Sequence, residues 1–512
     1  MNLSCPPASI HDLLRAQAAR QPEAPAILAP GRSPLSYAGL LGQAEAAVSA
    51  LNALGLDRND RVVLVLPNGP ELAAAFVALG AGVTCAPLNP AYREGEFDFY
   101  LSDLGAKALV IGGSSHSPAV AVAQERGIPI IELKSDSSQP AGVFSLSGEP
   151  WQAGPPRGFS GPPDIALALH TSGTTSRPKL VPLTQTNICT SAFNIAQSLS
   201  LNASDRCLNV MPLFHIHGLL GAVLSTLTAG GSVVCTPGFD AIRFFRWMQE
   251  FQPTWYTAVP TMHQAIVARA ARNQEIVAAS RLRLIRSCSS ALLPQVMAEV
   301  ERVFRAPVIE SYGMTEAAHQ MASSPLPPRL RKPGSVGVAA GPELAIMDQA
   351  GRLLGPGQTG EVVVRGPSVT TGYEGNPEAN ATAFTAGWFR TGDQGYLDED
   401  GYLYLTGRLK EIINRGGEKI SPREIDEVLM DHPAVEQALT FAVPHASLGE
   451  DVAAAVVLRE GSSATEKEIR KFASKRLADF KVPRRIVFLQ EIPKGPTGKP
   501  QRIGLAQKLG LG

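Results

Sequence analysis

The sequence has no excess of charge of either sign. Its 512 residues include 46 Lys and Arg and 46 Asp and Glu, so the formal net charge is zero. This balance argues against a nucleic-acid-binding protein with a basic surface and against an acidic solvating protein. Hydrophobic residues make up 44% and charged residues 18% of the chain, which excludes wholesale disorder and predicts a large buried core.

The sequence also lacks metal-ribbon, secretion and membrane signals. None of its six cysteines forms a C-x-x-C pair, which argues against a zinc ribbon and against thioredoxin chemistry. The first residues have no basic and apolar leader regions, and no uncharged apolar run is long enough to span a bilayer. Scattered single cysteines fit a reducing compartment, so we expect a cytoplasmic protein without a membrane span.

Strand-like and helix-like segments alternate near the start of the chain. Residues 61–66 are a buried-strand type of run, 70–80 predict a helix that ends at glycine, and 83–88 form a second strand-like run. Strand–helix–strand units of this spacing favour a parallel α/β sheet.

The last stretch of about 100 residues predicts a separate, smaller α+β domain. Ser421 and Thr465 each begin a capping-box pattern for a helix start, and the strand-like run 452–458 lies between them. We therefore expect a large N-terminal α/β domain with mixed and parallel sheets over residues 1–409. A small, mobile α+β domain would follow over residues 410–512.

The strongest local signal is a loop rich in hydroxyl groups. Residues 171–179 read T-S-G-T-T-S-R-P-K and follow the strand-like run 165–169. Hydroxyls, backbone N–H groups and one ammonium can wrap a polyphosphate. The segment is not a Walker A loop, because Pro178 stands where the second glycine should be. Taken alone, it also fits an ordinary Ser/Thr-rich surface loop.

This loop resembles the phosphate-loop signature of the AMP-forming adenylate synthetases, which include acyl-CoA synthetases, adenylation domains and luciferases. The common form of that signature has glycine where Ser176 and Leu180 stand here. Four further blocks follow in the family's order, so the resemblance covers nearly the whole chain. They are S-Y-G-M-T-E at 311–316, T-G-D at 391–393, G-R-L-K at 407–410 and K-G-P-T-G-K at 494–499.

The resemblance implies ATP, Mg²⁺ and coenzyme A (CoA), and it assigns roles to single residues. Tyr312 would stack on adenine, Thr315 would lie near the α-phosphate, and Glu316 would hold Mg²⁺, which prefers carboxylate and phosphate oxygens. Asp393 would accept both ribose hydroxyls, and Arg408 would also contact ribose. The implied nucleotide and CoA site comprises Thr171, Ser172, Gly173, Thr174, Thr175, Lys179, Ser289, Glu310, Ser311, Tyr312, Gly313, Met314, Asp393, Arg408, Gly416 and Gly417.

The resemblance also implies a reaction in two halves. A carboxylate attacks the α-phosphate of ATP and pyrophosphate leaves, while Mg²⁺ and Lys499 stabilise the transition state electrostatically. A thiol attacks the acyl-adenylate after the small domain has turned about the hinge Lys410. This turn would bring in Gly416 and Gly417, beside which a pantetheine arm can pass. The implied catalytic residues are Lys499, Glu316, Thr315 and Lys410.

The acid-binding side is expected to carry several hydrogen-bond donors. A small dianionic acid needs such donors for its distal carboxylate, whereas a fatty tail needs an apolar tunnel. Serines stand at positions 289 and 290, where small glycines are common in the family. The set resembles the oxalate–CoA ligase branch of the family. The candidate acid-binding residues are His215, His217, Val259, Ser289, Ser290 and His319.

Several alternatives stay open at this point. The chain could be a ligase for another short or aryl acid, or a free-standing adenylation domain that loads a carrier protein. Asp240 stands where amino-acid-activating domains carry an aspartate, but no carrier domain is attached. A non-catalytic adenylate-binding scaffold would be expected to have lost Lys499, Glu316 or the phosphate loop, and all three are intact. The predicted partners are a small carboxylic acid, ATP and CoA.

The balanced net charge conceals a local excess. From Lys467 to Gly512, twelve Lys and Arg residues stand against three Asp and Glu residues. A solvated basic face explains such a run. The alternative is that a mobile small domain carries positive charge to the phosphate groups of ATP and CoA.

Overall fold

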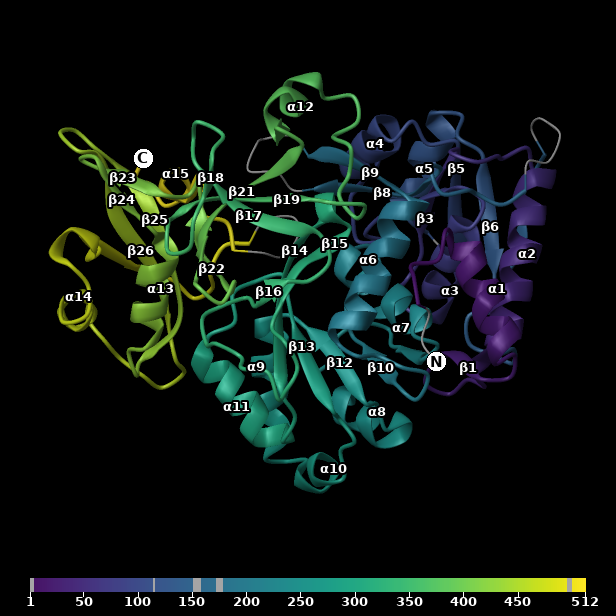
Figure 1. The fold of residues 1–512 in the computed structure, drawn as a ribbon, viewed down its shortest axis with the longest axis horizontal. Coiled ribbons are helices and arrows are strands. Elements are labelled where there is room, and N and C mark those ends of the chain that lie inside the picture. The colour runs from purple at the N-terminus through teal and green to yellow at the C-terminus, as the bar shows by residue number, and fades with distance from the viewer. Residues whose placement is uncertain (1–3, 114–115, 151–157, 172–177, 495–499) are drawn as a thin grey trace. The chain divides into compact units, whose positions relative to one another are not determined.

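The computed structural model describes residues 4–113, 116–150, 158–171, 178–494 and 500–512, and Figure 1 gives the labels of its helices and strands. The chain divides into two compact units. The first contains the described residues up to 171 together with 179–344 and 364–389. The second contains 345–363 and the described residues from 390 to 512.

A largely parallel sheet opens the first unit. The predicted strand–helix–strand unit is confirmed, because β3 (Arg61–Val65) and β4 (Thr84–Pro87) pair in parallel and α3 (Pro70–Gly80) connects them. α3 is buried from Leu72 to Gly80, as expected for a helix that is apolar all round. The seven strands have the order β7-β6-β5-β3-β4-β8-β9, with β5 (Ala108–Gly112), β6 (Ile130–Lys134), β7 (Ser145–Ser147), β8 (Ile165–Thr171) and β9 (Lys179–Thr184).

A second sheet of nine strands completes the first unit. Its central strands β1, β11, β10, β12, β13 and β14 are all parallel to one another, and side chains at the carboxyl ends of such strands meet at one edge. The order is β16-β15-β14-β13-β12-β10-β11-β1-β2, with β1 (Pro25–Leu28), β2 (Leu35–Ser36), β10 (Arg206–Asn209), β11 (Ser232–Cys235), β12 (Trp255–Ala258), β13 (Leu284–Ser287), β14 (Val308–Met314), β15 (His319–Ser323) and β16 (Val338–Ala339).

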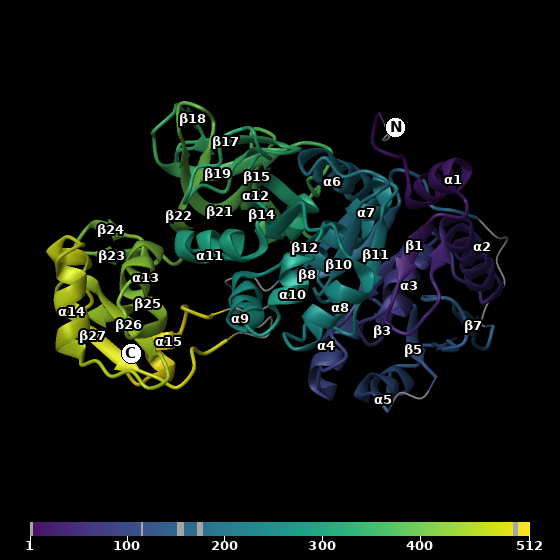
Figure 2. The same cartoon turned by 90° about the horizontal axis from the view of Figure 1, so that it is seen from below.

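Helices pack on both sheets of the first unit. Figure 2 shows α1, α2 and α3 side by side, and α8 places five large apolar side chains in a core cluster with β10 to β14. The remaining helices are α1 (Ile10–Arg20), α2 (Tyr37–Ala53), α4 (Glu94–Asp103), α5 (Pro118–Glu125), α6 (Gln185–Ser198), the π-helix η1 (His217–Leu224), α7 (Ser225–Thr228), α8 (Arg243–Phe251), α9 (Pro260–Ala270), α10 (Gln274–Ala278), α11 (Pro294–Phe304), the 3₁₀ turn η2 (Thr315–Ala317) and α12 (Pro377–Ala383).

The second unit combines mostly antiparallel strands with three helices in its described part. Most of a six-stranded sheet belongs to it, although residues 343–344, 364–365, 384–385 and 388–389 of that sheet are assigned to the first unit. The sheet contains β17 (Glu343–Met347), β18 (Leu353–Leu354), β19 (Gly360–Arg365), β20 (Phe384–Thr385), β21 (Trp388–Leu397) and β22 (Leu403–Arg408). A five-stranded sheet contains β23 (Ile413–Arg415), β24 (Glu418–Ile420), β25 (Val435–His445), β26 (Gly449–Leu458) and β27 (Arg485–Phe488). The helices are α13 (Pro422–Met430), α14 (Glu466–Ser474) and α15 (Leu505–Lys508), with the 3₁₀ turn η3 (Asp479–Lys481).

The two predicted helix starts of this unit have different outcomes. At Thr465 the capping box is confirmed, because its hydroxyl accepts from the backbone N–H of Glu468 and the Glu468 side chain accepts in return. At Ser421 the helix start is confirmed but the capping box is wrong. The Ser421 hydroxyl instead donates to the backbone carbonyl of Thr406, so a tertiary contact replaces the local cap.

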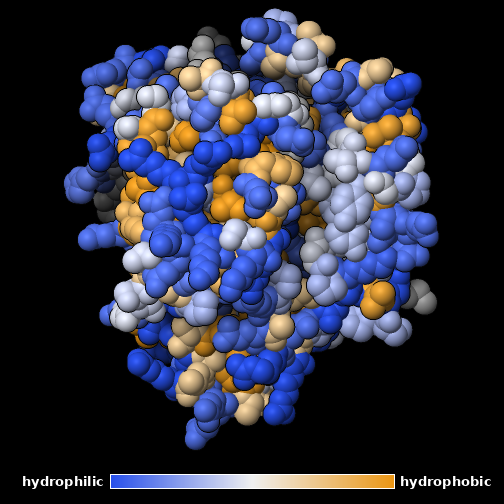
Figure 3. Space-filling model, turned by 90° about the vertical axis from the view of Figure 1, so that its left-hand side faces the viewer, coloured by the Kyte–Doolittle hydropathy of each residue, from blue (hydrophilic) through white to orange (hydrophobic). Residues whose placement is uncertain are grey.

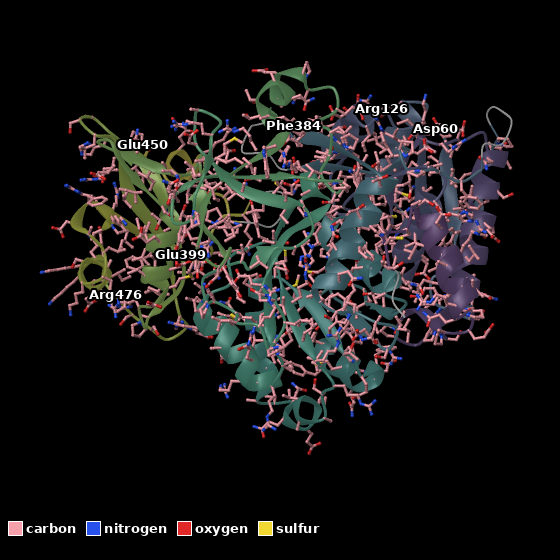
Figure 4. The ribbon with its side chains drawn as sticks, viewed as in Figure 1. Asp60, Arg126, Phe384, Glu399, Glu450 and Arg476 are labelled. Carbon is pink, nitrogen blue, oxygen red and sulfur yellow. The ribbon has the colours of Figure 1, made fainter. Side chains whose placement is uncertain are left out.

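The predicted mixed α/β fold with a smaller α+β unit is confirmed. In the described part of the chain, no helix combines the length and the apolar character needed to cross a bilayer. Hydrophilic side chains cover much of the surface in Figure 3, with separate hydrophobic patches between them. Arg476, just beyond α14, extends outward in Figure 4 and is exposed.

Candidate active site

Two antiparallel strands flank the predicted phosphate loop. Thr171 ends β8 and Lys179 begins β9, and these two residues are paired across the strands. The predicted loop residues Ser172, Gly173, Thr174 and Thr175 lie outside the described residues. The Lys179 ammonium lies 4.3 Å from the centre of the Tyr373 ring. This cation–π contact positions the Lys179 side chain at the start of β9.

The predicted metal ligand Glu316 is a buried carboxylate. It lies in η2 with 5% of its surface exposed, and one of its oxygens accepts a hydrogen bond of 2.9 Å from the Tyr373 hydroxyl. Burial and this carboxylate raise the pKa of Tyr373 well above its ordinary value, so the hydroxyl stays a donor. Mg²⁺ is commonly held by one or two carboxylates together with substrate phosphates, and Glu316 fits that role.

Tyr373 was missed by the sequence analysis, although it connects Glu316 with Lys179. The only local signal was the position of Tyr373. It directly follows the polar segment Thr370-Thr371-Gly372, in a region without a strand pattern. The backbone N–H of Thr370 also donates to the backbone carbonyl of Glu316 at 2.7 Å. This segment therefore positions Glu316 through both side chain and backbone.

The predicted adenine block lies on β14, where a glycine is required. A Cβ atom at Gly313 would come within 1.7 Å of the His319 carbonyl oxygen, so only glycine permits the pairing of β14 with β15. Glu310 is buried and its carboxylate accepts from the backbone N–H of Leu292. Tyr312 is also buried, while Met314 and Thr315 are partly exposed. The Ser311 hydroxyl accepts from Arg286, so this side chain contacts the acid-binding side.

Three of the predicted acid-binding residues come together. His217 begins η1, and its Nδ1 lies 3.0 Å from the Ser289 hydroxyl while its Nε2 lies 2.6 Å from the Thr257 hydroxyl. The centre of its ring is 5.1 Å from that of His319. Both histidines are only 2% exposed. A π-helix at this point is consistent with a functional site.

Backbone strain accompanies two of these residues. Ser289 has a φ of +73° and His319 a φ of +98°, conformations that non-glycine residues rarely adopt. Such strain costs on the order of 1–3 kcal/mol for each residue and concentrates at functional sites. The strained backbone therefore supports the prediction that Ser289 and His319 bind substrate.

Arg286 is in contact with His319 and was not assigned a role by the sequence analysis. The strands β12, β13 and β14 are parallel neighbours, and Thr257 is paired with Arg286. The guanidinium is fully buried and donates to the Ser311 hydroxyl (3.1 Å), His319 Nε2 (3.0 Å) and the Gln320 side-chain oxygen (3.1 Å). We call Thr257, His217, Ser289, His319 and Arg286 the polar cluster. The detectable signal was that Arg286 directly follows Leu284-Ile285 within a strand-like stretch.

The other predicted acid-binding residues are placed differently. His215 is partly exposed and its ring lies 4.7 Å from that of Phe214. Val259 is the N-cap residue of α9, and Ser290 is exposed. The structure therefore places His217, and not His215, in the polar cluster.

The predicted ribose contacts meet in the second unit. Asp393 on β21 is paired with Arg408 on β22, and their side chains form an ion pair of 3.2 Å. The preceding turn is well anchored, because the backbone N–H of Gly392 donates to Glu361, which also pairs with Arg390. A carboxylate held in this way is a suitable acceptor for a vicinal diol.

The predicted hinge and CoA loop lie close together in the sequence of this unit. Lys410 is exposed directly after β22. Gly416 and Gly417 have φ values of +59° and +98° and connect β23 to β24. Two consecutive positive φ values are typical of a type I′ hairpin turn, which explains both glycines. Lys499 lies outside the described residues.

This combination of fold and site defines the adenylate-forming class of enzymes. The family model described as AMP-binding enzyme matches residues 14–374, and the model described as AMP-binding enzyme C-terminal domain matches residues 424–499. The chain therefore belongs to the family of AMP-binding enzymes. The predicted identification as an AMP-forming acyl-CoA synthetase that uses ATP, Mg²⁺ and CoA is confirmed.

Similar proteins cover nearly the whole chain. An oxalate–CoA ligase of Arabidopsis thaliana is 44% identical over 505 residues, which are 98% of each chain. An oxalate–CoA ligase of Saccharomyces cerevisiae is 43% identical over 477 residues, covering 88% of this chain and 87% of the relative. The crystal structure of ATP-bound MatB from Rhodopseudomonas palustris has a TM-score of 0.87 at 30% identity and 99% coverage of both chains.

Proposed function

We propose that this ligase joins oxalate to CoA. The observation that carries the proposal is the polar cluster, in which buried hydrogen-bonding groups of His217, Ser289 and His319 stand in front of the cation of Arg286. A distal carboxylate would gain charge-assisted hydrogen bonds there. A fatty tail would instead desolvate polar groups without replacing their partners. The two relatives named oxalate–CoA ligases support the same substrate.

The first half-reaction would form oxalyl-adenylate. One carboxylate oxygen of the acid forms a bond to the α-phosphorus of ATP, and the bond to the pyrophosphate oxygen breaks. We assign phosphate binding to residues 171–179, adenine stacking to Tyr312, ribose binding to Asp393 and Arg408, and transition-state stabilisation to Lys499. Glu316 would hold Mg²⁺, which neutralises charge on the phosphate oxygens when bound.

The second half-reaction would form the thioester. The thiol sulfur of CoA attacks the acyl carbon, loses its proton and displaces AMP. We propose that residues 410–512 form the moving domain and that Lys410 absorbs its rotation against residues 1–409. The I′ turn at Gly416 and Gly417 supports a role beside the pantetheine arm, because a Cβ atom at Gly417 would meet no atom within 4 Å. The six free cysteines support a reducing compartment, and we propose the cytoplasm.

An acid panel tests the substrate. Wild-type enzyme is assayed by ATP–pyrophosphate exchange and by thioester formation with oxalate, malonate, acetate, benzoate and palmitate. Oxalate is expected to have the highest kcat/KM in both assays. A preference for benzoate or palmitate would contradict the proposal, and transfer to a carrier protein in place of free CoA would favour the adenylation-domain alternative.

A further inference from the structure

Arg286 carries a buried charge without an acidic partner. Its three hydrogen-bond partners, Ser311, His319 and Gln320, are uncharged acceptors in this arrangement. Among the residues that the structure describes, no carboxylate forms an ion pair with Arg286, and the undescribed segments contain no Asp or Glu. The nearest acidic residue in the adjacent strand, Glu310, accepts from the backbone of Leu292.

Such an arrangement is costly and therefore needs a reason. A buried charge is ordinarily paired, and an arginine cannot lose its proton to avoid the cost. The same chain follows the ordinary rule three residues earlier. Arg283 makes two hydrogen bonds of 2.6 and 2.7 Å to the carboxylate of Asp205, which is buried.

The contact with His319 has a chemical consequence. A guanidinium only donates hydrogen bonds, so Nε2 of His319 is the acceptor and the ring carries its proton on Nδ1. Glycine is required for this contact, because a Cβ atom at Gly221 would come within 2.5 Å of His319 Nε2 and 3.0 Å of an Arg286 nitrogen. Three elements, β13, β15 and η1, thus converge to hold one orientation of the imidazole.

We propose that Arg286 is a positioning and specificity-determining residue that makes the acid pocket selective for dianions. It holds His319 with Nδ1–H as the donor, and it supplies the positive charge that the second carboxylate of the substrate balances. The inference rests on the proposed function, because it requires that the distal carboxylate of the substrate binds at the polar cluster. Substrate binding supplies the counter-charge that the folded chain lacks.

The test compares a dianion with a monoanion in variants at position 286. Arg286→Met removes the charge and the donors, and Arg286→Lys keeps the charge but not the planar fork. For Arg286→Met, we expect kcat/KM for oxalate to fall by about 10- to 100-fold, mainly through KM, and kcat/KM for acetate to change by less than about threefold. Arg286→Lys should retain part of the oxalate preference. KM for ATP should stay near the wild-type value in both.

Controls separate selectivity from folding. Arg283→Lys changes a neighbouring arginine outside the cluster and should leave the oxalate-to-acetate ratio unchanged. If Arg286→Met does not fold, the same ratio is measured in Arg286→Gln, which keeps an amide donor. Equal losses of kcat/KM for oxalate and for acetate would overturn the inference. A wild-type ratio of these two kcat/KM values in the folded variants would overturn it as well. A wild-type enzyme that prefers monoanions would instead overturn the proposed function.

Discussion

Each unit contains an arginine that is largely shielded from solvent, and the two charges are paired in opposite ways: Arg286 is fully buried and the side chain of Arg502 is 17% exposed. In the first unit, Arg286 is surrounded by a serine, a histidine and a glutamine. In the second unit, Arg502 pairs with the carboxylate of Asp426 on α13 and lies 3.5 Å from that of Glu411. Burial raises the pKa of Asp426 to about 6, although Arg502 lowers it.

The difference separates a structural charge from a charge kept for a ligand. Arg502 follows Lys499 by three residues, and Glu411 follows Lys410 by one. The pair with Asp426 therefore ties the chain beyond the proposed catalytic lysine to α13, and the positive charge of Arg502 is fully compensated. Arg286 has no such compensation, so its charge is available to a substrate.

The largest expected effect is on stability and comes from the second unit. Arg502→Met leaves two carboxylates without their cation, and breaking a buried pair costs about 3 kcal/mol. Arg286→Met strands three neutral acceptors at about 1 kcal/mol each, but it also removes an unpaired buried charge, so we expect a net loss of only about 1 kcal/mol. Urea unfolding of the two variants at pH 7.5 measures both free-energy losses. Hydrogen exchange in α13 tests whether the loss in Arg502→Met arises at that helix. Equal losses in both variants would remove the distinction between the two arginines.

A histidine tests whether the first unit excludes a further unpaired positive charge from its core. His263 on α9 is fully buried beside the hydroxyl of Tyr256, and burial lowers its pKa to about 4. The unfolded chain binds a proton near pH 6.5 and the folded chain does not, so stability from this group is present above pH 6.5 and is lost as the pH falls. Between pH 7.5 and 5, wild type should lose about 2 kcal/mol relative to His263→Gln.

Thermal and urea unfolding across this pH range measure the difference. Other titrating groups are common to both proteins and cancel. A constant difference between wild type and variant would mean that the core accepts a charged histidine, and the unpaired Arg286 would then be less exceptional.

Patterns local in sequence predicted much of the fold, whereas the residues of the nucleotide side were implied by the resemblance to the family. The strand–helix–strand unit around α3 and the pairing of Asp393 with Arg408 arise from short-range periodicity and a hairpin. The missed features depend on contacts between distant segments. The Ser421 hydroxyl bonds Thr406 instead of its own helix, and Tyr373 reaches Glu316 across 57 residues.

The choice of histidine could not be predicted for the same reason. His215 and His217 are two residues apart and chemically identical, and only the start of η1 opposite Ser289 and Thr257 selects His217. The role of Arg286 likewise depends on its neighbours in space, because the sequence around it, R-L-R-L-I-R at 281–286, does not reveal whether a carboxylate faces its side chain.

The smallest effect is expected from a third arginine, which is solvent-exposed. Arg476 lies in the basic C-terminal segment, and its guanidinium is 3.8 Å from the centre of the Phe472 ring. An exposed cation–π contact is worth about 0.5 kcal/mol, and water solvates this charge fully in the absence of a ligand. Arg476→Ala should therefore change the unfolding free energy by about that amount and leave KM for CoA unchanged at low salt. A KM for CoA that is higher in the variant than in wild type at low salt, with no difference between the two at high salt, would show that the basic segment attracts phosphate groups. Charge kept for a ligand would then occur in both units, on the surface of one and in the core of the other.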